Sequence, residues 1–230
     1  MGRLNSNREY LLQHFDSAFL REPQKACFKE VINLEDLLLK IKDECYADFC
    51  NLKGIKHLIE NYHSKRSDWE RYCYLDPKES YSSNLVIENP GRYSALILCW
   101  QPGKGGKIQA HEGSDCFFKI LQGCLKEEQY HWPSFRGTPM ELEQEQTYYV
   151  DDLNYMSDVK GLHRVTNNSE DQVAVSLHIH TPPFRHYSWF KEETGELNRS
   201  EVTFVSVGGK PKGHACILVN QYSENSNQFL

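Results

Sequence analysis

The sequence lacks several features that would assign it to a particular class of proteins. It has no long basic run, and its 26 lysine and arginine residues are outnumbered by 32 aspartate and glutamate residues, for a net charge of −6. No stretch approaches the roughly 18 apolar residues of a transmembrane helix, and the polar start of the chain does not resemble a signal peptide. These absences argue against nucleic acid or a membrane as a partner and favour a cytoplasmic protein.

Cysteine is present, but not in the spacing of a zinc ribbon or a small disulfide scaffold. The eight positions are Cys27, Cys45, Cys50, Cys73, Cys99, Cys116, Cys124 and Cys216. No two of them form a CxxC pair. Without a signal peptide, we expect reduced thiols, most of them buried as small hydrophobic side chains. Cys116 is the exception, because it lies inside a frame typical of a metal site.

Residues 33–63 carry a helical pattern. Apolar side chains recur at helical spacing, first at Leu34, Leu38 and Ile41 and then again over 55–62. Asn33 is a candidate N-cap for the first of these segments, and Gly54 interrupts the stretch. The sequence therefore predicts a helical segment near the N-terminus.

After Trp69 the pattern changes to short runs that are apolar or alternate between apolar and polar residues. These runs occupy 84–88, 94–100, 107–111, 116–121, 146–150, 172–180 and 201–207. Clusters of Gly, Pro, Asn and Asp separate them, as expected for turns between strands. The chain is therefore predicted to be mainly β, with a small antiparallel β-barrel or sandwich behind the helical segment. No linker divides the two, which favours a single domain.

One segment, GKGGKIQAHEGSDCFFKILQG at 103–123, has the frame of a metal site with one ligand replaced. It places Gln109 and His111 two residues apart, and such residues on a β-strand point to the same face. The usual way to hold a first-row metal at this spacing is a pair of histidines. Here the first of the two positions is glutamine.

Further motifs follow in order along the chain. They are Leu-Ile-Leu-Cys-Trp at 96–100, Trp-Pro at 132–133, Gly-Leu-His-Arg-Val at 161–165, and Ala-Val-Ser-Leu-His at 174–178. Together with the frame at 103–123, they resemble the cysteine dioxygenase family, over roughly residues 30–210. Members of this family are cupins that bind one non-haem iron and use O2 to oxidise the thiol of cysteine to a sulfinate.

The resemblance implies a metal site with three histidine ligands. His111 and His163 match two of them, and Gln109 stands at the position of the third. A carboxamide oxygen coordinates Fe(II) more weakly than an imidazole does. Two replacements remain open: Asp115, which would complete a site of two histidines and one carboxylate, and His180, which would restore three imidazoles.

The resemblance also assigns residues to the substrate pocket. Tyr81 matches the family, but Ser83 stands where an arginine grips the substrate carboxylate, and a hydroxyl offers only one neutral hydrogen bond in its place. Ser176 and His178 match residues that orient one another beside the metal. His180 replaces a tyrosine, which in some members is cross-linked to the cysteine that matches Cys116. That cross-link cannot form here in the usual way.

The resemblance implies a cytoplasmic monomer with one Fe(II) per chain, O2 as co-substrate and a small cysteine-like thiol as substrate. It divides the chain into an N-terminal extension at 1–25, a cysteine dioxygenase-like cupin domain at 26–215 and a polar tail at 216–230. The alternative function is a catalytically impaired cupin paralogue with a ligand-binding or regulatory role. This alternative arises because Gln109, Ser83 and His180 replace the family's histidine, arginine and tyrosine.

Overall fold

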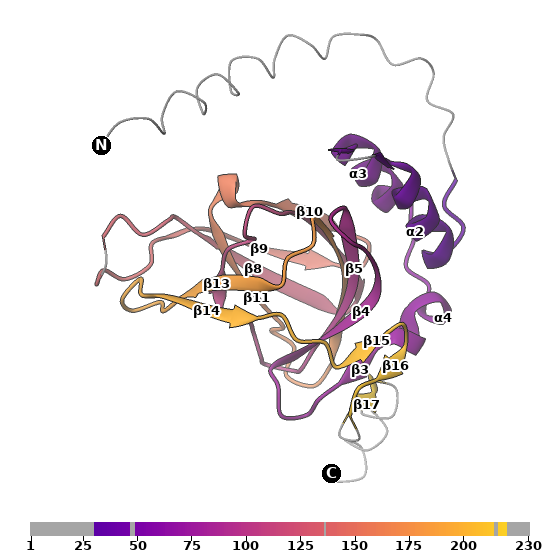
Figure 1. The fold of residues 1–230 in the computed structure, drawn as a ribbon. Helices are drawn as coiled ribbons and strands as arrows, with labels where there is room; N and C mark the ends of the chain where they lie inside the picture. The colour runs from indigo at the N-terminus through magenta and orange to yellow at the C-terminus, as the bar shows by residue number, and fades with distance from the viewer. Residues whose placement is uncertain (1–29, 47–48, 136, 214–215, 220–230) are drawn as a thin grey trace. The chain divides into compact units, whose positions relative to one another are not determined.

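A computed structural model of the chain describes residues 30–46, 49–135, 137–213 and 216–219 (Figure 1). The chain divides into two compact units, residues 1–30 and residues 31–230. Cys27 and the extension at 1–25 lie outside the described residues. The predicted domain boundaries stay a prediction.

The helical segment begins where the sequence predicts it. Asn33 caps α2 (Leu34–Asp43), and its side-chain oxygen accepts a hydrogen bond from the backbone of Asp36 at 2.9 Å. The second helix, α3 (Leu52–Glu60), is capped in the same way by Asn51. A short third helix, α4 (Arg66–Trp69), runs into a 3-10 turn, η1 (Glu70–Tyr72). The apolar faces of α2 and α3 are buried, as their helical spacing predicts.

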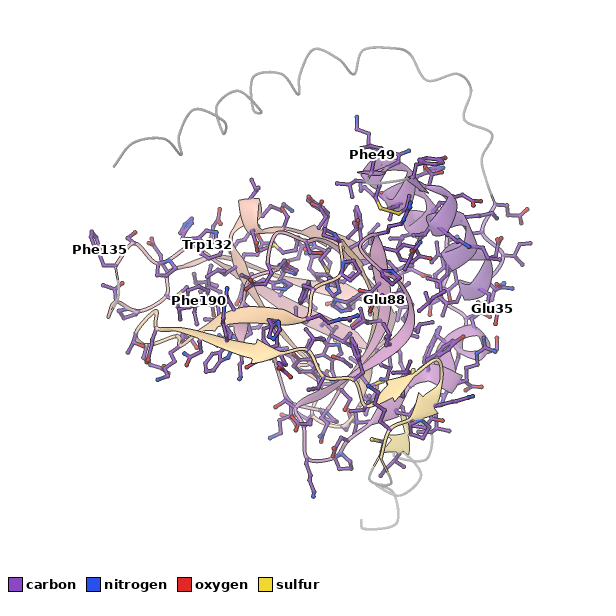
Figure 2. All side chains as sticks on the ribbon, viewed as in Figure 1. Glu35, Phe49, Glu88, Trp132, Phe135 and Phe190 are labelled. Carbon is purple, nitrogen blue, oxygen red and sulfur yellow. A yellow bond between two sulfur atoms is a disulfide. The ribbon has the colours of Figure 1, made fainter. Side chains whose placement is uncertain are left out.

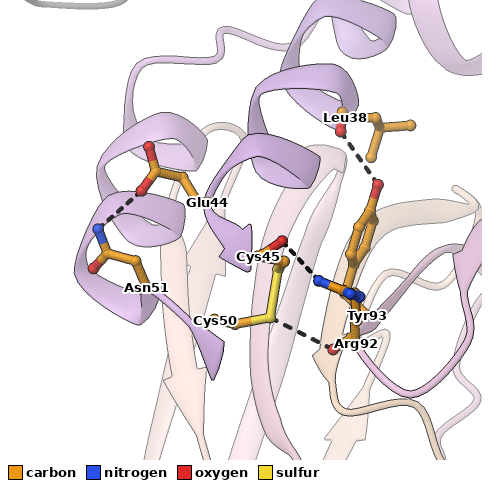
Figure 3. Close-up of a disulfide and its surroundings, with 7 residues drawn as sticks. All are labelled: Leu38, Glu44, Cys45, Cys50, Asn51, Arg92 and Tyr93. Atoms are coloured by element: carbon orange, nitrogen blue, oxygen red, sulfur yellow. Dashed lines mark hydrogen bonds between the residues drawn. A yellow bond between two sulfur atoms is a disulfide. The ribbon is translucent and has the colours of Figure 1, made fainter. Parts of the chain in front are cut away.

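The segment between α2 and α3 is not helical, so the helical stretch predicted over 33–63 is interrupted here and not at Gly54, which lies within α3. It contains the short strands β1 (Cys45–Tyr46) and β2 (Phe49–Cys50), which pair antiparallel. Their register places Cys45 opposite Cys50, and the two form a disulfide (Figure 3). The expectation of reduced thiols is therefore wrong for this pair. Arg92 donates to the carbonyl of Cys45 at 3.1 Å and ties the hairpin to the strands.

Most strands belong to two sheets. In spatial order, the seven-stranded sheet contains β10 (Leu153–Met156), β7 (Asp115–Gln122), β12 (Ala174–Thr181), β5 (Tyr93–Trp100), β4 (Tyr81–Asn89), β15 (Ser206–Val207) and β16 (Lys210–Pro211). The six-stranded sheet contains β14 (Leu197–Glu201), β13 (His186–Phe190), β6 (Ile108–Gln109), β11 (Leu162–Thr166), β8 (Cys124–Tyr130) and β9 (Leu142–Tyr149). All pairs in both sheets are antiparallel except β15 with β4. This mainly β architecture with an N-terminal helical segment agrees with the predicted cupin fold.

The central strands β7, β12 and β5 of the seven-stranded sheet are buried on both faces. Along β5, Ile97 and Cys99 belong to the core cluster that also contains the apolar faces of α2 and α3. The alternate residues Leu96, Leu98 and Trp100 belong to a second cluster, toward the six-stranded sheet. Because both faces are covered, β5 reads as a continuous apolar run, and for that reason it is easily found in the sequence.

Several strands are not predicted from the sequence pattern, among them β8, β10, β11, β13 and β14. The most consequential is β8, whose sequence CLKEEQY alternates poorly because polar side chains are buried within it. Glu127 and Gln129 are 2% and 6% exposed. A rule that expects apolar residues on a buried strand face misses such a strand.

The end of the described chain packs onto the domain. β17 (Ile217–Leu218), which the prediction assigns to the polar tail, pairs antiparallel with β3 (Tyr74–Leu75), and Val219 is buried in the core. The rest of the predicted tail, 220–230, lies outside the described residues. Within the part of the chain that the structure describes, no helix has the length and apolar character to cross a membrane.

Candidate metal centre

The six-stranded sheet brings together the two metal positions that the sequence places far apart. On β6, Gln109 lies directly opposite His163 of β11. His111 follows two residues later, and the rings of His111 and His163 lie 4.7 Å apart between centroids. Both histidines are almost fully buried. The two predicted histidines therefore share one site, with Gln109 beside them.

The backbone that carries His111 is fixed by a carboxylate from another part of the chain. Asp158 accepts hydrogen bonds from the backbone N–H groups of His111 and Gly113, each at 2.6 Å. Asp158 is itself tied through its carbonyl to the indole N–H of Trp132 at 3.0 Å. Trp132 in turn packs edge-on against Phe190 of β13, with 5.7 Å between ring centroids (Figure 2). Asp158 is a positioning residue that the sequence alone does not reveal.

His163 is oriented by Glu127 of the neighbouring strand β8. The Nδ1 atom of His163 lies 2.7 Å from Oε1 of Glu127, and both side chains are 2% exposed. Gln129 and Asn154 also donate to this carboxylate, at 2.9 Å and 2.6 Å. Burial raises the pKa of Glu127, but the hydrogen bonds from His163 and Gln129 outweigh it, so the pKa lies below its usual value. A carboxylate that accepts from Nδ1–H leaves Nε2 of His163 free for a ligand.

On the seven-stranded sheet, alternating residues of β12 face the same site. Ser176 accepts from the indole N–H of Trp100 at 2.9 Å and lies 2.9 Å from Nε2 of His178. The serine hydroxyl therefore bridges the indole of Trp100 and the imidazole of His178. On the other side of the ring, Nδ1 of His178 lies 3.8 Å from the sulfur of Cys116. Ser176 and His178 thus orient one another, as the resemblance implies.

His180 and Cys116 lie directly opposite each other on β12 and β7. With His111 they form a group in which one ligand atom of each residue lies within 4.8 Å of the other two. The rings of His111 and His180 are 6.3 Å apart between centroids. The position of the family's cross-link therefore holds an imidazole and a buried thiol, and burial raises the pKa of Cys116.

Asp115 does not join this group. It precedes Cys116 on β7, so the pleat directs it to the opposite face. Its carboxylate accepts a hydrogen bond from the hydroxyl of Tyr155. Strand β6 ends at Gln109, and a turn separates it from β7. Asp115 therefore does not continue the strand of Gln109, although its proposed role as a replacement ligand depends on such a continuous strand.

The donor set fits a transition-metal ion. Burial and then the neighbouring His163 lower the pKa of His111 well below its usual value, and burial likewise lowers the pKa of His178 and brings that of His180 to about 4. These imidazoles are therefore neutral near pH 7, which is the form that binds metals. Nδ1 of His111 is buried and has no hydrogen-bond partner among the described residues. A buried, unpartnered imidazole nitrogen is expected where a metal completes the site.

A cavity of about 430 Å³ opens beside these residues, between the two sheets. Its wall includes Gln109, His111, His163, His178 and His180 of the candidate metal centre, together with the predicted substrate residues Tyr81 and Ser83. Tyr81 stacks on Trp100, with 4.6 Å between ring centroids. Burial, followed by the neighbouring Tyr187, raises the pKa of Tyr81, so its hydroxyl stays protonated. The volume is suited to a small organic ligand.

Acidification is expected to destabilise the metal-free protein. The pKa of His180 is about 4 in the folded chain against 6.5 ordinarily, so the unfolded state binds more protons between these values. The free energy of unfolding is therefore expected to fall by about 1–3 kcal/mol as the pH decreases from 6.5 toward 4. Denaturant unfolding of the wild type and a His180→Phe variant, in chelator at several pH values, measures this. Identical pH dependence in the two proteins would contradict the expectation.

The comparisons with known proteins identify the family of this chain. The family model described as cysteine dioxygenase type I matches residues 25–193. Cysteine dioxygenase type 1 of Rattus norvegicus is 38% identical over 173 residues, which cover 75% of this chain and 86% of the relative. That of Danio rerio is 36% identical over 178 residues, covering 77% and 88%. That of Homo sapiens is 36% identical over 173 residues, covering 75% and 86%.

Among solved structures, the protein TT1209 from Thermus thermophilus aligns with 50% of this chain and 94% of its own, at 22% identity and a TM-score of 0.40. A likeness this distant does not bear on function. The family match spans most of the described domain and contains the candidate metal-site residues from Gln109 to His180. The chain belongs to the cysteine dioxygenase type I family.

Proposed function

We propose that this protein is an iron-dependent thiol dioxygenase of the cysteine dioxygenase type. The reaction combines one thiol with one O2 to give one sulfinic acid, so both oxygen atoms become bonded to sulfur and no further reductant is consumed. The observation that carries the proposal is the pair of buried, facing histidines His111 and His163 on the wall of a cavity of about 430 Å³. No relative reported above supports the alternative of a non-catalytic paralogue.

His111 and His163 would hold the iron, which when bound supplies the redox chemistry that lets O2 react with a thiol. Glu127 would keep Nε2 of His163 directed toward it. Gln109 is the candidate for the third ligand by position, and His180 is the candidate by chemistry, because imidazole suits iron better than a carboxamide does. Cys116 lies within reach of His111 and His180.

The remaining residues would position the thiol and exclude water. Tyr81 keeps a protonated hydroxyl at the cavity wall, and Ser83 offers a neutral hydroxyl on the same strand. The linked side chains of Trp100, Ser176 and His178 would fix the orientation of the His178 ring at the cavity wall. The location in the cytoplasm and the monomeric state stay predictions.

His180→Phe distinguishes the two candidates for the third ligand. If His180 binds the metal, the variant is expected to lower Fe(II) affinity by about tenfold or more. Gln109→Ala is the matched control and is then expected to change the affinity less. Anaerobic titration of Fe(II) into the two variants and the wild type measures this. Unchanged iron affinity in His180→Phe, with a loss in Gln109→Ala, would assign the third position to Gln109 instead.

The activity itself is tested by oxygen uptake. Protein loaded with Fe(II) under nitrogen is mixed with aerated buffer and cysteine, cysteamine or 3-mercaptopropionate. We expect oxygen consumption with at least one thiol, and equal amounts of sulfinate formed and O2 consumed. A His111→Ala variant is the control and is expected to consume no oxygen above background. If protein with bound iron consumes no oxygen with any small thiol, the proposed function is wrong.

A further inference from the structure

The charged residues around the cavity are unevenly distributed. Four charged side chains line it among the described residues: the acids Asp76, Glu79 and Glu201 and the base Lys107. Glu79, Glu201 and Lys107 are exposed and Asp76 is half-buried, so these charges lie at the mouth of the cavity rather than at its base. The mouth therefore carries an excess of negative charge.

Among the described residues that line the cavity, Lys107 is the only lysine or arginine, and its side chain points toward an aromatic ring. The ammonium of Lys107 lies 3.8 Å from the centroid of the Trp189 ring, a cation–π contact at the surface. An exposed ammonium held in this way remains hydrated and provides no buried partner for an anion deeper in the cavity. Lys107 therefore does not make the cavity an anion site.

Beyond the mouth, the described residues that line the cavity include no lysine or arginine, so the inner wall offers a carboxylate no cationic side chain. Toward the histidines, its polar side chains are neutral, with Ser83, Tyr81 and Gln109 among them. An ionised carboxylate removed from water needs a charged or multiply hydrogen-bonded partner, and a single hydroxyl does not replace one. A ligand that carries a free carboxylate is therefore disfavoured inside this cavity.

The negative charge at the mouth attracts a cation that approaches the cavity. Three carboxylates at the mouth raise the local concentration of positively charged solutes, and their effect decreases as salt screens them. The cavity also exceeds the size of a two-carbon thiol, which leaves space for a substituent beyond the amine.

We propose that the ligand of this cavity is a thiol that carries an amine and no free carboxylate. This inference rests on the proposed function for the fate of the thiol, but the charge preference is a property of the cavity alone. Two sources share this chemistry: a free aminoalkanethiol, and the N-terminal cysteine of a peptide, whose carboxyl group is an amide.

Calorimetric binding tests the preference without turnover. Under nitrogen, the protein with one equivalent of Fe(II) is titrated with cysteamine, L-cysteine and 3-mercaptopropionate, which differ in charge. Cysteamine is expected to bind at least about tenfold more tightly than L-cysteine, with 3-mercaptopropionate weakest, and higher salt is expected to reduce the difference. A short peptide with an N-terminal cysteine is the second arm: binding at least as tight as that of cysteamine identifies the peptide as the source, and weaker binding identifies the free aminoalkanethiol.

Two variants test separately the charges at the mouth and the neutral inner wall. A Glu79→Gln, Glu201→Gln double variant is expected to weaken cysteamine binding about threefold or more, whereas Glu193→Gln, an exposed acid away from the cavity, is the control and is expected to leave it unchanged. Ser83→Arg is expected to reverse the order, so that 3-mercaptopropionate binds more tightly than cysteamine. Circular dichroism establishes that each variant is folded.

The inference is overturned if L-cysteine or 3-mercaptopropionate binds the wild type as tightly as cysteamine, or if no thiol binds. Oxygen uptake, measured separately, tests the proposed function. Cysteamine-selective binding without sulfinate from any thiol leaves the charge preference standing and overturns the dioxygenase. Sulfinate formed selectively from L-cysteine supports the dioxygenase and overturns the charge preference.

Discussion

Replacing Glu127 with alanine is expected to lower the free energy of unfolding by about 3–5 kcal/mol. The carboxylate is almost fully buried and accepts from His163, Gln129 and Asn154, and its removal leaves these donors without a partner. Denaturant unfolding at pH 7 measures the loss. A change below about 1 kcal/mol would mean that water or a side-chain rearrangement satisfies the donors, and the structural role of Glu127 would then be refuted.

Glu127→Gln separates positioning from stability, because the amide keeps the size of the side chain. The amide no longer accepts from Nδ1 of His163 with a charged oxygen, so Fe(II) affinity is expected to fall by about 10–100-fold while the protein stays folded. Glu128→Gln is the matched control: its carboxylate is bonded to Arg164 at 2.6 Å rather than to a metal-site residue. Equal iron affinity in the two variants would contradict the role of Glu127.

Gln109→His is expected to raise Fe(II) affinity by about tenfold or more, equivalent to about 1.4 kcal/mol. The position lies opposite His163 on paired strands and two residues before His111, so a third imidazole would enter an existing site. Anaerobic titration against a chelator of known affinity measures the change.

Gln172→His is the matched control, because Gln172 is exposed and does not line the cavity. It is expected to leave the iron affinity unchanged. If Gln109→His binds iron no more tightly than the wild type, position 109 is not a ligand position in this chain, and the site instead depends on His180 and its neighbours.

The elements that can be predicted from the sequence are those whose pattern is local. Asn33 indicates the start of α2 because an N-cap needs only its own next turn, and β5 stands out because all of its residues are buried. Strand β8 cannot be predicted in the same way, because its buried residues Glu127 and Gln129 are polar and have their partners on neighbouring strands. The disulfide cannot be predicted either, because it depends on the register of the β1–β2 hairpin, which lies within a stretch predicted to be helical.

The same distinction holds for the candidate site. His111, His163, Ser176 and His178 are predicted by their place in family motifs, and the structure brings them to one site. Asp158 and Glu127 belong to no motif that the sequence reveals. They act through contacts at sequence separations of 47 and 36 residues, which only the fold makes.

The most direct test of the central claim is the origin of the oxygen in the product. Iron-loaded protein is incubated with cysteamine and with L-cysteine under isotopically heavy O2, and the masses of the sulfinates are measured by mass spectrometry. We expect a sulfinate in which both oxygen atoms are heavy, formed only when His111 and His163 are intact. A protein that holds iron and yields no doubly labelled sulfinate from either thiol would contradict this expectation.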